Sequence, residues 1–326
     1  MTMSVGGHPG AGARVGAFGK TPRAADFLYY GPVDADTQAL RDWLEDGVSW
    51  ASARAPEVWR QALTELPVFG FVFRAPSGNL VVGALRPSSD SVGRHFPISA
   101  YVVLPGPGLS TYPHVLPLWL GELLQYAAGA VLTDDVLGAV AQLEVTIASG
   151  ALLPLSGLHQ DARDYAEWVN ATELTVAFDT LFGAESRASA IQALHTISEA
   201  ILPFRSRERP KTPLSVRVPL GAAGAGGAAF WIDVVRHAAG WRDTVPTFFW
   251  SSSEAGGEAI VQLGDVPASS LSALWHADAG REHVCDLTHL TAADAARFFP
   301  LLPPAVAAVL TRADARVSDL LNALHS

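Results

Sequence analysis

A short pattern near the N-terminus has the residue types of a phosphate-binding loop. Gly16–Thr21 reads GAFGKT, so it ends in the Gly-Lys-Thr of a P-loop. A P-loop also needs a glycine five residues before its second glycine, because the glycines let backbone N–H groups surround the phosphates. Arg14 stands at that position, and the nearest glycines, Gly12 and Gly16, are out of register by two. We therefore predict no nucleotide site here.

Other catalytic and metal-binding patterns are incomplete or missing. The sequence has neither the G-x-S-x-G elbow of a serine hydrolase nor an H-E-x-x-H zinc helix. His283, Cys285 and His289 are close in sequence, but a structural zinc site needs four ligands and Asp286 would have to be recruited. The adjacent aspartates 134–135 point in different directions on a helix and are typical of a helix start. We predict a protein that is not an enzyme and has no catalytic residue, cofactor or metal.

Two loops combine charged residues with turn-forming residues. The first motif loop is Gly19–Phe27 (GKTPRAADF), and the second motif loop is Arg86–Pro97 (RPSSDSVGRHFP). Glycine and proline in both indicate abrupt changes of chain direction. Packing alone does not require this density of charge, so the loops are the candidate functional residues.

We expect the two motif loops to meet at one end of a sheet. In one hypothesis, Asp26 or Asp90 pairs with Arg94 or Lys20, and the fixed charges form a rigid surface that orients a partner. In the alternative, Asp90 caps its own turn and Arg94 bonds to local carbonyls, which holds the loop together. Both roles can hold at once.

The elements around these loops predict an α+β fold. A strand at Arg14–Phe18 leads into the first motif loop, and apolar spacing after the N-cap Asp34 predicts a helix. Three β-type runs, Val68–Arg74, Leu80–Arg86 and Phe96–Leu104, have short links that favour an antiparallel meander. Helical spacing from 116 to 127 predicts a long helix covering this sheet.

The remaining chain divides into further segments. We predict a flexible tail at 1–13, an α+β domain at 14–133, a mostly helical segment at 134–204, and a smaller α/β unit at 205–326. This last unit has predicted strands at 214–218, 247–250 and 259–263, with a helix at 228–238 closed by Gly240. An amphipathic helix from Val306 to Leu324, introduced by Pro303-Pro304, ends the chain and docks on its own core or on a partner.

Composition excludes several function classes. The 326 residues are 49% hydrophobic and carry a net charge of −10 with only two lysines, Lys20 and Lys211, so nucleic acid is excluded as the main partner. The single Cys285 excludes an internal disulfide framework and fits a reducing compartment. No signal peptide is recognisable, and prolines interrupt the longest uncharged run, 96–121, so we predict no membrane insertion.

The two motif loops resemble the signatures of the TagF/ImpM family, G-K-x-P-x-x-x-D-F and P-S-x-D-x-V-G-R-x-F-P. Trp43 and the strand Pro67–Phe73 lie where the family has tryptophans and a P-x-W-R-F-like strand. Trp250 and the turn Gly264–Pro267 resemble a C-terminal tryptophan strand and turn. The matching residues are Gly19, Lys20, Pro22, Asp26, Phe27, Pro87, Ser88, Asp90, Gly93, Arg94, Phe96, Pro97 and Trp250.

The chain also departs from the family pattern. Ala25 and Ser91 replace residues that are usually glycine and arginine, and Val68-Phe69-Gly70 lacks the usual tryptophan and arginine of the strand. The departures concern the surface chemistry more than the fold.

The resemblance implies a bacterial, cytoplasmic, post-translational repressor of type VI secretion that acts by protein–protein interaction. Its implied partner is the forkhead-associated scaffold protein of the secretion system. Two alternatives stay open: a structural subunit of the secretion baseplate, and a phosphate-handling hydrolase that uses Lys20, Asp90 and Arg94. The oligomeric state is left open.

Overall fold

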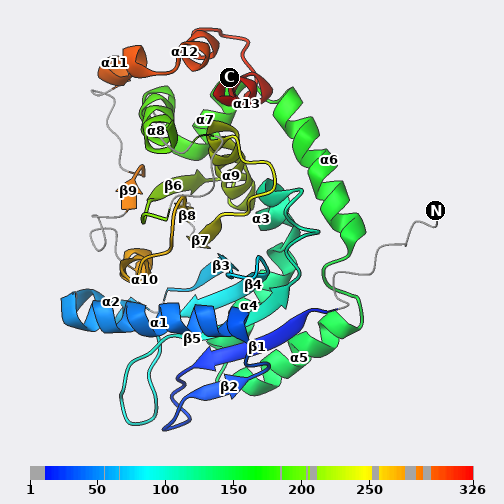
Figure 1. Cartoon of the computed structure of the whole chain (residues 1–326), viewed down its shortest axis with the longest axis vertical. Helices are drawn as coiled ribbons and strands as arrows, with labels where there is room; N and C mark the ends of the chain where they lie inside the picture. The colour runs from blue at the N-terminus through cyan, green and yellow to red at the C-terminus, as the bar shows by residue number, and fades with distance from the viewer. Residues whose placement is uncertain are drawn as a thin grey trace.

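A computed structural model describes residues 12–54, 56–65, 67–183, 186–202, 205, 211–251, 257–275, 284–288 and 295–325. In this part of the chain the strands form one nine-stranded sheet in the order β2-β1-β5-β4-β3-β7-β8-β6-β9, antiparallel except for β6 with β9 (Figure 1). The strands are β1 (Arg14–Gly19), β2 (Leu28–Tyr30), β3 (Phe69–Arg74), β4 (Leu80–Arg86), β5 (Ile98–Leu104), β6 (Ser215–Gly221), β7 (Thr247–Ser251), β8 (Gly257–Gln262) and β9 (Val284–Asp286).

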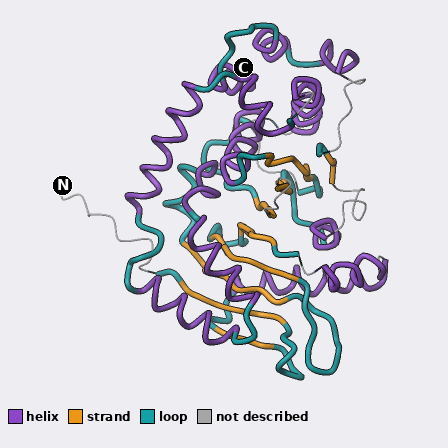
Figure 2. Tube along the Cα trace, turned by 180° about the vertical axis from the view of Figure 1, so that it is seen from behind, coloured by secondary structure: helices purple, strands orange, loops and turns teal. Residues whose placement is uncertain are grey.

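Helices cover both faces of the sheet. They are α1 (Ala35–Arg54), α2 (Pro56–Glu65), η1 (Pro113–Val115), α3 (Leu116–Trp119), α4 (Gly121–Leu132), α5 (Val136–Ala148), α6 (Leu155–Ala171), α7 (Leu174–Phe182), α8 (Ser186–Ile201), α9 (Ala225–Ala239), α10 (Ser269–Trp275), α11 (Ala295–Phe298), η4 (Phe299–Leu301), α12 (Pro304–Leu310) and α13 (Val317–His325). Helices α1, α2 and α10 bury one core, which is rich in Phe and Trp. The helices from α3 to α9, with α12 and α13, bury the other core, and α6 runs along the edge of the molecule (Figure 2).

The predicted α+β fold and its meander are confirmed. Strands β3, β4 and β5 pair in sequence order, with Phe69 opposite Leu85 and Leu80 opposite Leu104. Strand β5 begins two residues later than predicted, because the backbone of Phe96 bonds instead to Ser88 within the second motif loop. Long β-branched and aromatic runs with a tight turn between them therefore predicted the pairing correctly.

The C-terminal strands extend the same sheet. Strand β7 pairs with β3, which places Trp250 opposite Gly70 and Phe249 opposite Phe71. The Trp43 indole adds a second link, since its Nε1 donates to the Pro267 carbonyl at 3.2 Å. The division into a 14–133 domain, a 134–204 segment and a 205–326 unit stays a prediction.

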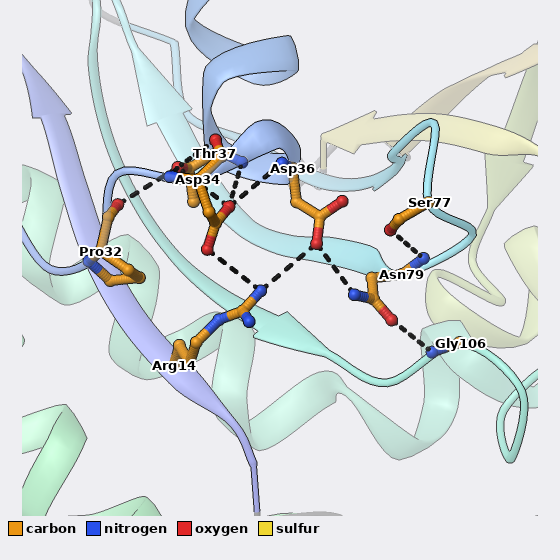
Figure 3. Close-up of polar contacts among 8 residues, drawn as sticks. All are labelled: Arg14, Pro32, Asp34, Asp36, Thr37, Ser77, Asn79 and Gly106. Atoms are coloured by element: carbon orange, nitrogen blue, oxygen red, sulfur yellow. Dashed lines mark hydrogen bonds and ion pairs between the residues drawn. The ribbon is translucent and has the colours of Figure 1, made fainter.

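Several predicted helix ends are confirmed. Asp34 is the N-cap of α1, because its Oδ1 accepts the backbone N–H groups of Asp36 and Thr37 at 3.1 and 3.0 Å (Figure 3). Asp135 caps α5 in the same way through the Gly138 N–H. Gly240 ends α9 in the left-handed conformation at φ +66°.

The predicted helix over 116–127 is wrong as a single element. The chain breaks at Leu120, and the segment Pro113–Trp119 meets Gly121–Leu132 at 58°. Pro113 and Pro117 cannot donate backbone hydrogen bonds, and Gly121 has weak helix propensity, so this stretch does not hold one straight helix. No single described helix has the length and apolar content of a membrane span; only this bent pair does when its two halves are counted together.

The predicted C-terminal helix from 306 to 324 is also wrong as a single element. It divides into α12 and α13, because the linker binds the α6–α7 connection. Ala315 accepts the N–H of Leu174, and Val317 donates its N–H to Thr172. Helix α13 docks on its own chain, burying Val317, Leu320, Leu321 and Leu324.

Candidate functional site

The sheet register brings the two motif loops together. Gly19 at the end of β1 pairs with Ile98 at the start of β5, and Ile98 also pairs with Arg86 at the end of β4. The loop that follows β1 and the loop that connects β4 to β5 therefore leave the sheet at the same end of the strands. The Ser91 N–H donates to the Ala24 carbonyl at 2.9 Å and ties one loop to the other.

Gly19 allows this close approach. Its φ is +142°, and a Cβ at this position would lie 2.0 Å from the Pro97 carbonyl oxygen. No other residue type fits against that backbone, so the first motif loop begins at a position that only glycine occupies without strain. The next residue, Lys20, is thereby placed beneath the second motif loop.

Asp90 is the centre of the loop network. Its Oδ1 accepts the backbone N–H groups of Val92 and Arg94 at 3.1 and 2.8 Å, which closes the turn. Its Oδ2 accepts Lys20 Nζ at 3.0 Å and Arg94 Nε at 2.7 Å. One carboxylate thus holds its own turn and both cations, and both roles predicted for it occur together.

The loop network keeps the Asp90 carboxyl in its ionised form. Burial by itself would raise the pKa of the Asp90 carboxyl. The hydrogen bonds from the Arg94 backbone, from Lys20 and from the Arg94 guanidinium outweigh burial and hold this pKa well below its usual range. Asp90 therefore carries its negative charge across the physiological pH range.

Lys20 is enclosed rather than available to a substrate. Its Nζ lies 5.0 Å from the centroid of the Phe27 ring, and only 8% of its side chain is exposed. Phe27 in turn stacks on Phe18 at 5.4 Å and meets the edge of Phe96 at 4.9 Å. Lys20 and Asp90 therefore lie beneath the surface of the loops, because the aromatic cluster and the turn cover them.

Arg94 connects the buried network to the surface. Its Nη2 contacts the Ala25 carbonyl and lies 3.9 Å from Asp26 Oδ1. The Arg94 side chain is 57% exposed and that of Asp26 is 99% exposed. The guanidinium is therefore held by Asp90 and the Ala25 carbonyl, while its other side remains open to solvent beside the exposed Asp26 carboxylate.

The motif residues divide into a buried set and an exposed set. The buried set holds the loops in place and contains Gly19, Lys20, Pro87, Ser88, Asp90, Phe96 and Pro97. Phe27 is half-buried, and the exposed set at the loop tips contains Pro22, Asp26, Gly93 and Arg94. Only the exposed set can contact another molecule without rearrangement.

Trp250 does not join this network. It lies on β7, across the strands β5, β4 and β3 from β1. Its half-buried indole covers Gly70, where an added Cβ would lie 3.1 Å from the ring. Gly70 stands where the corresponding strand of the TagF/ImpM family has arginine. The absence of a side chain at this position leaves room for the indole.

The main cavities of the described chain are not lined by Lys20, Asp90 or Arg94. Within the described residues, no group of three or more His, Cys, Asp and Glu side chains could hold a metal ion. Cys285 is exposed on β9, while His283 and His289 lie outside the described residues.

A second polar network holds the opposite end of the sheet (Figure 3). Arg14 Nη2 lies 3.2 Å from Asp34 Oδ2 and 3.3 Å from Asp36 Oδ2. Asn79 donates to Asp36 at 2.8 Å and accepts the Gly106 N–H. Burial alone would raise the pKa of Asp36, but hydrogen bonds from the β3–β4 turn and the nearby Arg14 lower it. This network joins β1, α1 and the β3–β4 turn.

Sequence reasoning missed a third, buried cluster around Asp233. Asp233 accepts Tyr165 Oη at 3.2 Å and Arg236 Nη2 at 2.7 Å, with His237 Nδ1 at 3.1 Å and His114 Nδ1 at 3.8 Å. The i, i+3, i+4 spacing of Asp233, Arg236 and His237 was the only signal, because Tyr165 and His114 come from other elements. Burial opposes ionisation of Asp233, but His237, His114 and Arg236 lower its pKa to about 2.

Because of this cluster, we predict that the free energy of unfolding decreases in acid. Burial lowers the pKa of His114 from 6.5 to about 4, even though Asp233 opposes the shift. As pH falls, the His114 side chain therefore binds its proton at a higher pH in the unfolded chain than in the folded chain. The stability that is present above pH 6.5 is lost as the pH falls to about 4. We expect a loss of about 3 kcal/mol in the free energy of unfolding from this group. Asp233 adds a second loss, beginning below the ordinary carboxyl pKa of 3.8 and continuing as pH falls to about 2.

Urea unfolding of the parent, of His114→Gln and of His159→Gln at pH 7, 5.5 and 4.5 measures the first of these losses. His159 is exposed and serves as the control. The His114 variant should lose clearly less stability between pH 7 and 4.5 than the parent and the control. Equal losses in all three proteins would contradict the assignment.

Comparisons with known proteins match part of this chain, and the matched family model spans both motif loops. Residues 16–140 match the family model described as the TagF N-terminal domain, type VI secretion system-associated. The crystal structure of PA0076 from Pseudomonas aeruginosa PAO1 aligns at 25% identity, covering 40% of this chain and 62% of that chain, with a TM-score of 0.33. The alignment spans less than two thirds of that protein. No curated protein matches the chain.

Proposed function

We propose, from the match of residues 16–140 to the type VI secretion-associated TagF N-terminal domain model, that the protein is a cytoplasmic, non-enzymatic regulator of type VI secretion. It represses assembly or firing by binding a forkhead-associated scaffold protein. The exposed set of the motif loops makes the contact, and the buried set keeps the loops rigid.

The observation that carries the proposal is that the Arg94 guanidinium is both held in place and exposed to solvent. Asp90 and the Ala25 carbonyl hold the guanidinium, so little side-chain entropy is lost when a partner binds it. Its open side presents a positive charge at a fixed position, and the exposed Asp26 adds a negative charge beside it. Neighbouring charges of opposite sign favour orientation and specificity of binding.

The enclosed Lys20 and Asp90 support a binding role over the hydrolase alternative. A phosphate-handling site requires Lys20 and Arg94 to converge on an open pocket, whereas Lys20 is covered by Phe27. A baseplate subunit would be retained stoichiometrically in purified assemblies, whereas a regulator should be absent or substoichiometric.

Single substitutions in the exposed set test the proposal. We expect Arg94→Ala and Asp26→Ala to raise the Kd for the forkhead-associated scaffold protein roughly tenfold, because each removes a charge from the contact. The measurement is calorimetric titration with the purified proteins, together with a secretion assay in cells.

The matched control is Arg312→Ala. Arg312 is 48% exposed and pairs with Asp314, and its substitution should leave the affinity unchanged. Asp26 is exposed enough that its variant should melt with the parent. If both loop variants fold normally, bind and repress like the parent, the loop tips are not the interface. If the parent itself binds no forkhead-associated protein, the named partner is wrong.

A further inference from the structure

A cleft beside Trp43 is not used by the proposed function. This cleft, the Trp43 cleft, has a volume of about 550 Å³ and lies between one face of α1, the end of β3 with the β3–β4 turn, and the β8–α10 connection. Helix α1 contributes Ala39, Trp43 and Asp46, and the β8–α10 connection contributes Asp265. Trp43 and the turn Gly264–Pro267 both resemble positions of the TagF/ImpM family, and neither belongs to the motif-loop network.

The Trp43 cleft has two ends along α1. The first and last α1 residues that line it are seven positions apart, which is roughly 10 Å along a helix. At the first end, the Asn79–Asp36 hydrogen bond of 2.8 Å holds the β3–β4 turn against the start of α1 (Figure 3). At the other end, the Trp43 Nε1–Pro267 hydrogen bond holds the β8–α10 connection against the middle of α1.

The two ends carry opposite charges that the chain itself does not pair. Asp46 and Asp265 are exposed and line the end at the middle of α1. Arg74 is half-buried and lines the cleft where β3 leads into the β3–β4 turn. Within the described residues, no hydrogen bond or ion pair engages the side chain of any of these three. The cleft therefore presents an acidic end and a basic end, each without a counter-charge.

The wall between the charged ends is aromatic and rigid. The Trp43 ring lies 6.0 Å from the Phe73 ring and stacks on the Phe249 ring at 5.1 Å. Trp43 and Phe73 are each 6% exposed, so they are fixed by the core beneath them. A fixed wall does not have to be ordered when another molecule binds, which lowers the entropic cost of binding.

We infer that the Trp43 cleft binds a short extended segment of a partner protein that carries Lys or Arg two or three residues from Asp or Glu. The basic side chain pairs with Asp46 and Asp265, and the acidic side chain pairs with Arg74, so the order of charges sets the direction of the segment. An extended chain rises about 3.3 Å per residue, so roughly three residues span the cleft. A free amino acid carries its ammonium and carboxylate on one carbon and does not reach both ends. This contact is separate from the motif loops and goes beyond the proposed function.

The chain offers matched variants for the acidic end. Asp46→Asn and Asp265→Asn remove the two charges with almost no change of shape, and both side chains are exposed and without a partner. Glu45 precedes Asp46 on α1, is also exposed, and does not line the cleft. Glu45→Gln therefore makes the same chemical change on the same helix outside the site.

The test is selection of a displayed library of random 15-residue peptides against the full chain, followed by affinity measurements on the enriched peptides. We expect these peptides to share the predicted pair of opposite charges. The double variant Asp46→Asn/Asp265→Asn should raise their Kd roughly tenfold, and Arg74→Gln should raise it about fivefold. Glu45→Gln and Arg94→Ala should each change it less than twofold.

A change in the peptide shows which charges pair. Replacing the basic residue of an enriched peptide with Gln should weaken its binding to the parent but not to the double variant, because that variant has already lost the acidic end. Thermal unfolding should show the double variant melting with the parent, so that a weaker affinity reports the site and not the fold.

Four results would overturn the inference. The selection could enrich no peptide, the enriched peptides could lack the charge pair, or they could bind the double variant as tightly as the parent. Sedimentation could also show a dimer of the parent that the double variant dissociates, which would make the occupant a second copy of this chain. Because Arg94→Ala is measured beside the cleft variants, failure of the motif-loop contact remains distinguishable from failure of the cleft.

Discussion

Replacing Gly19 with alanine is expected to lower the free energy of unfolding by at least about 3 kcal/mol. The added Cβ would lie 2.0 Å from the Pro97 carbonyl oxygen, and alanine is disfavoured at a φ of +142°. Relief requires β1 and the second motif loop to separate, which pulls Lys20 away from Asp90. Chemical unfolding of the purified variant measures the loss.

Gly93→Ala is the control for this variant. Gly93 also has a positive φ, +85°, but a Cβ there meets no atom within 4 Å. Its substitution should cost only about 1 kcal/mol, since strain is present without a clash. Similar losses for Gly19→Ala and Gly93→Ala would show that the close approach of β1 to Pro97 is unimportant.

Replacing Asp90 with alanine should be similarly damaging for an electrostatic reason. Lys20 would remain enclosed with no carboxylate, Arg94 would lose its anchor, and the N–H groups of Val92 and Arg94 would lose their acceptor. Leaving one member of a buried ion pair unpartnered is strongly destabilising, so we expect the melting temperature to fall by roughly 10 °C. Thermal unfolding followed by circular dichroism measures this change.

A double substitution separates the charge effect from the loss of packing. Lys20→Met combined with Asp90→Asn removes the buried cation, and asparagine keeps one oxygen for the turn N–H groups. This variant should melt closer to the parent than Asp90→Ala does. If the double variant is no better, the stranded Lys20 charge is not the cause. Asp26→Ala, which changes an almost fully exposed residue, should melt with the parent in the same experiment.

The charged residues of the buried set and of the exposed set have different effects when they are replaced. Replacing Lys20 or Asp90 of the buried set should lower stability and thereby impair every function of the loops. Replacing Asp26 or Arg94 of the exposed set should affect partner binding. Asp26→Ala should leave stability unchanged, whereas Arg94→Ala also removes a hydrogen bond to the buried Asp90 carboxylate and should lower stability modestly. Sequence spacing does not show which of these residues are buried, because each loop contributes one charged residue to each set. Lys20 and Asp26 belong to the first motif loop, and Asp90 and Arg94 belong to the second.

The sequence by itself determined the local elements. Alternating and β-branched runs specified β3, β4 and β5, and the turn residues between them fixed their antiparallel order. Asp34, Asp135 and Gly240 marked helix ends, because capping depends on a few neighbouring backbone groups. The two motif loops were also visible, since their residue types and spacing are local properties.

Only the tertiary structure decided which of these residues meet and which are buried. Pairing of β3 with β7 joins positions about 180 residues apart and places Trp250 against Gly70, and no local pattern encodes that pairing. Tertiary hydrogen bonds to the α6–α7 connection split the C-terminal helix despite its regular apolar spacing. Burial of Lys20 and Asp90 likewise depends on Phe27 and the second motif loop folding over them, because solvent exposure is a property of the assembled fold.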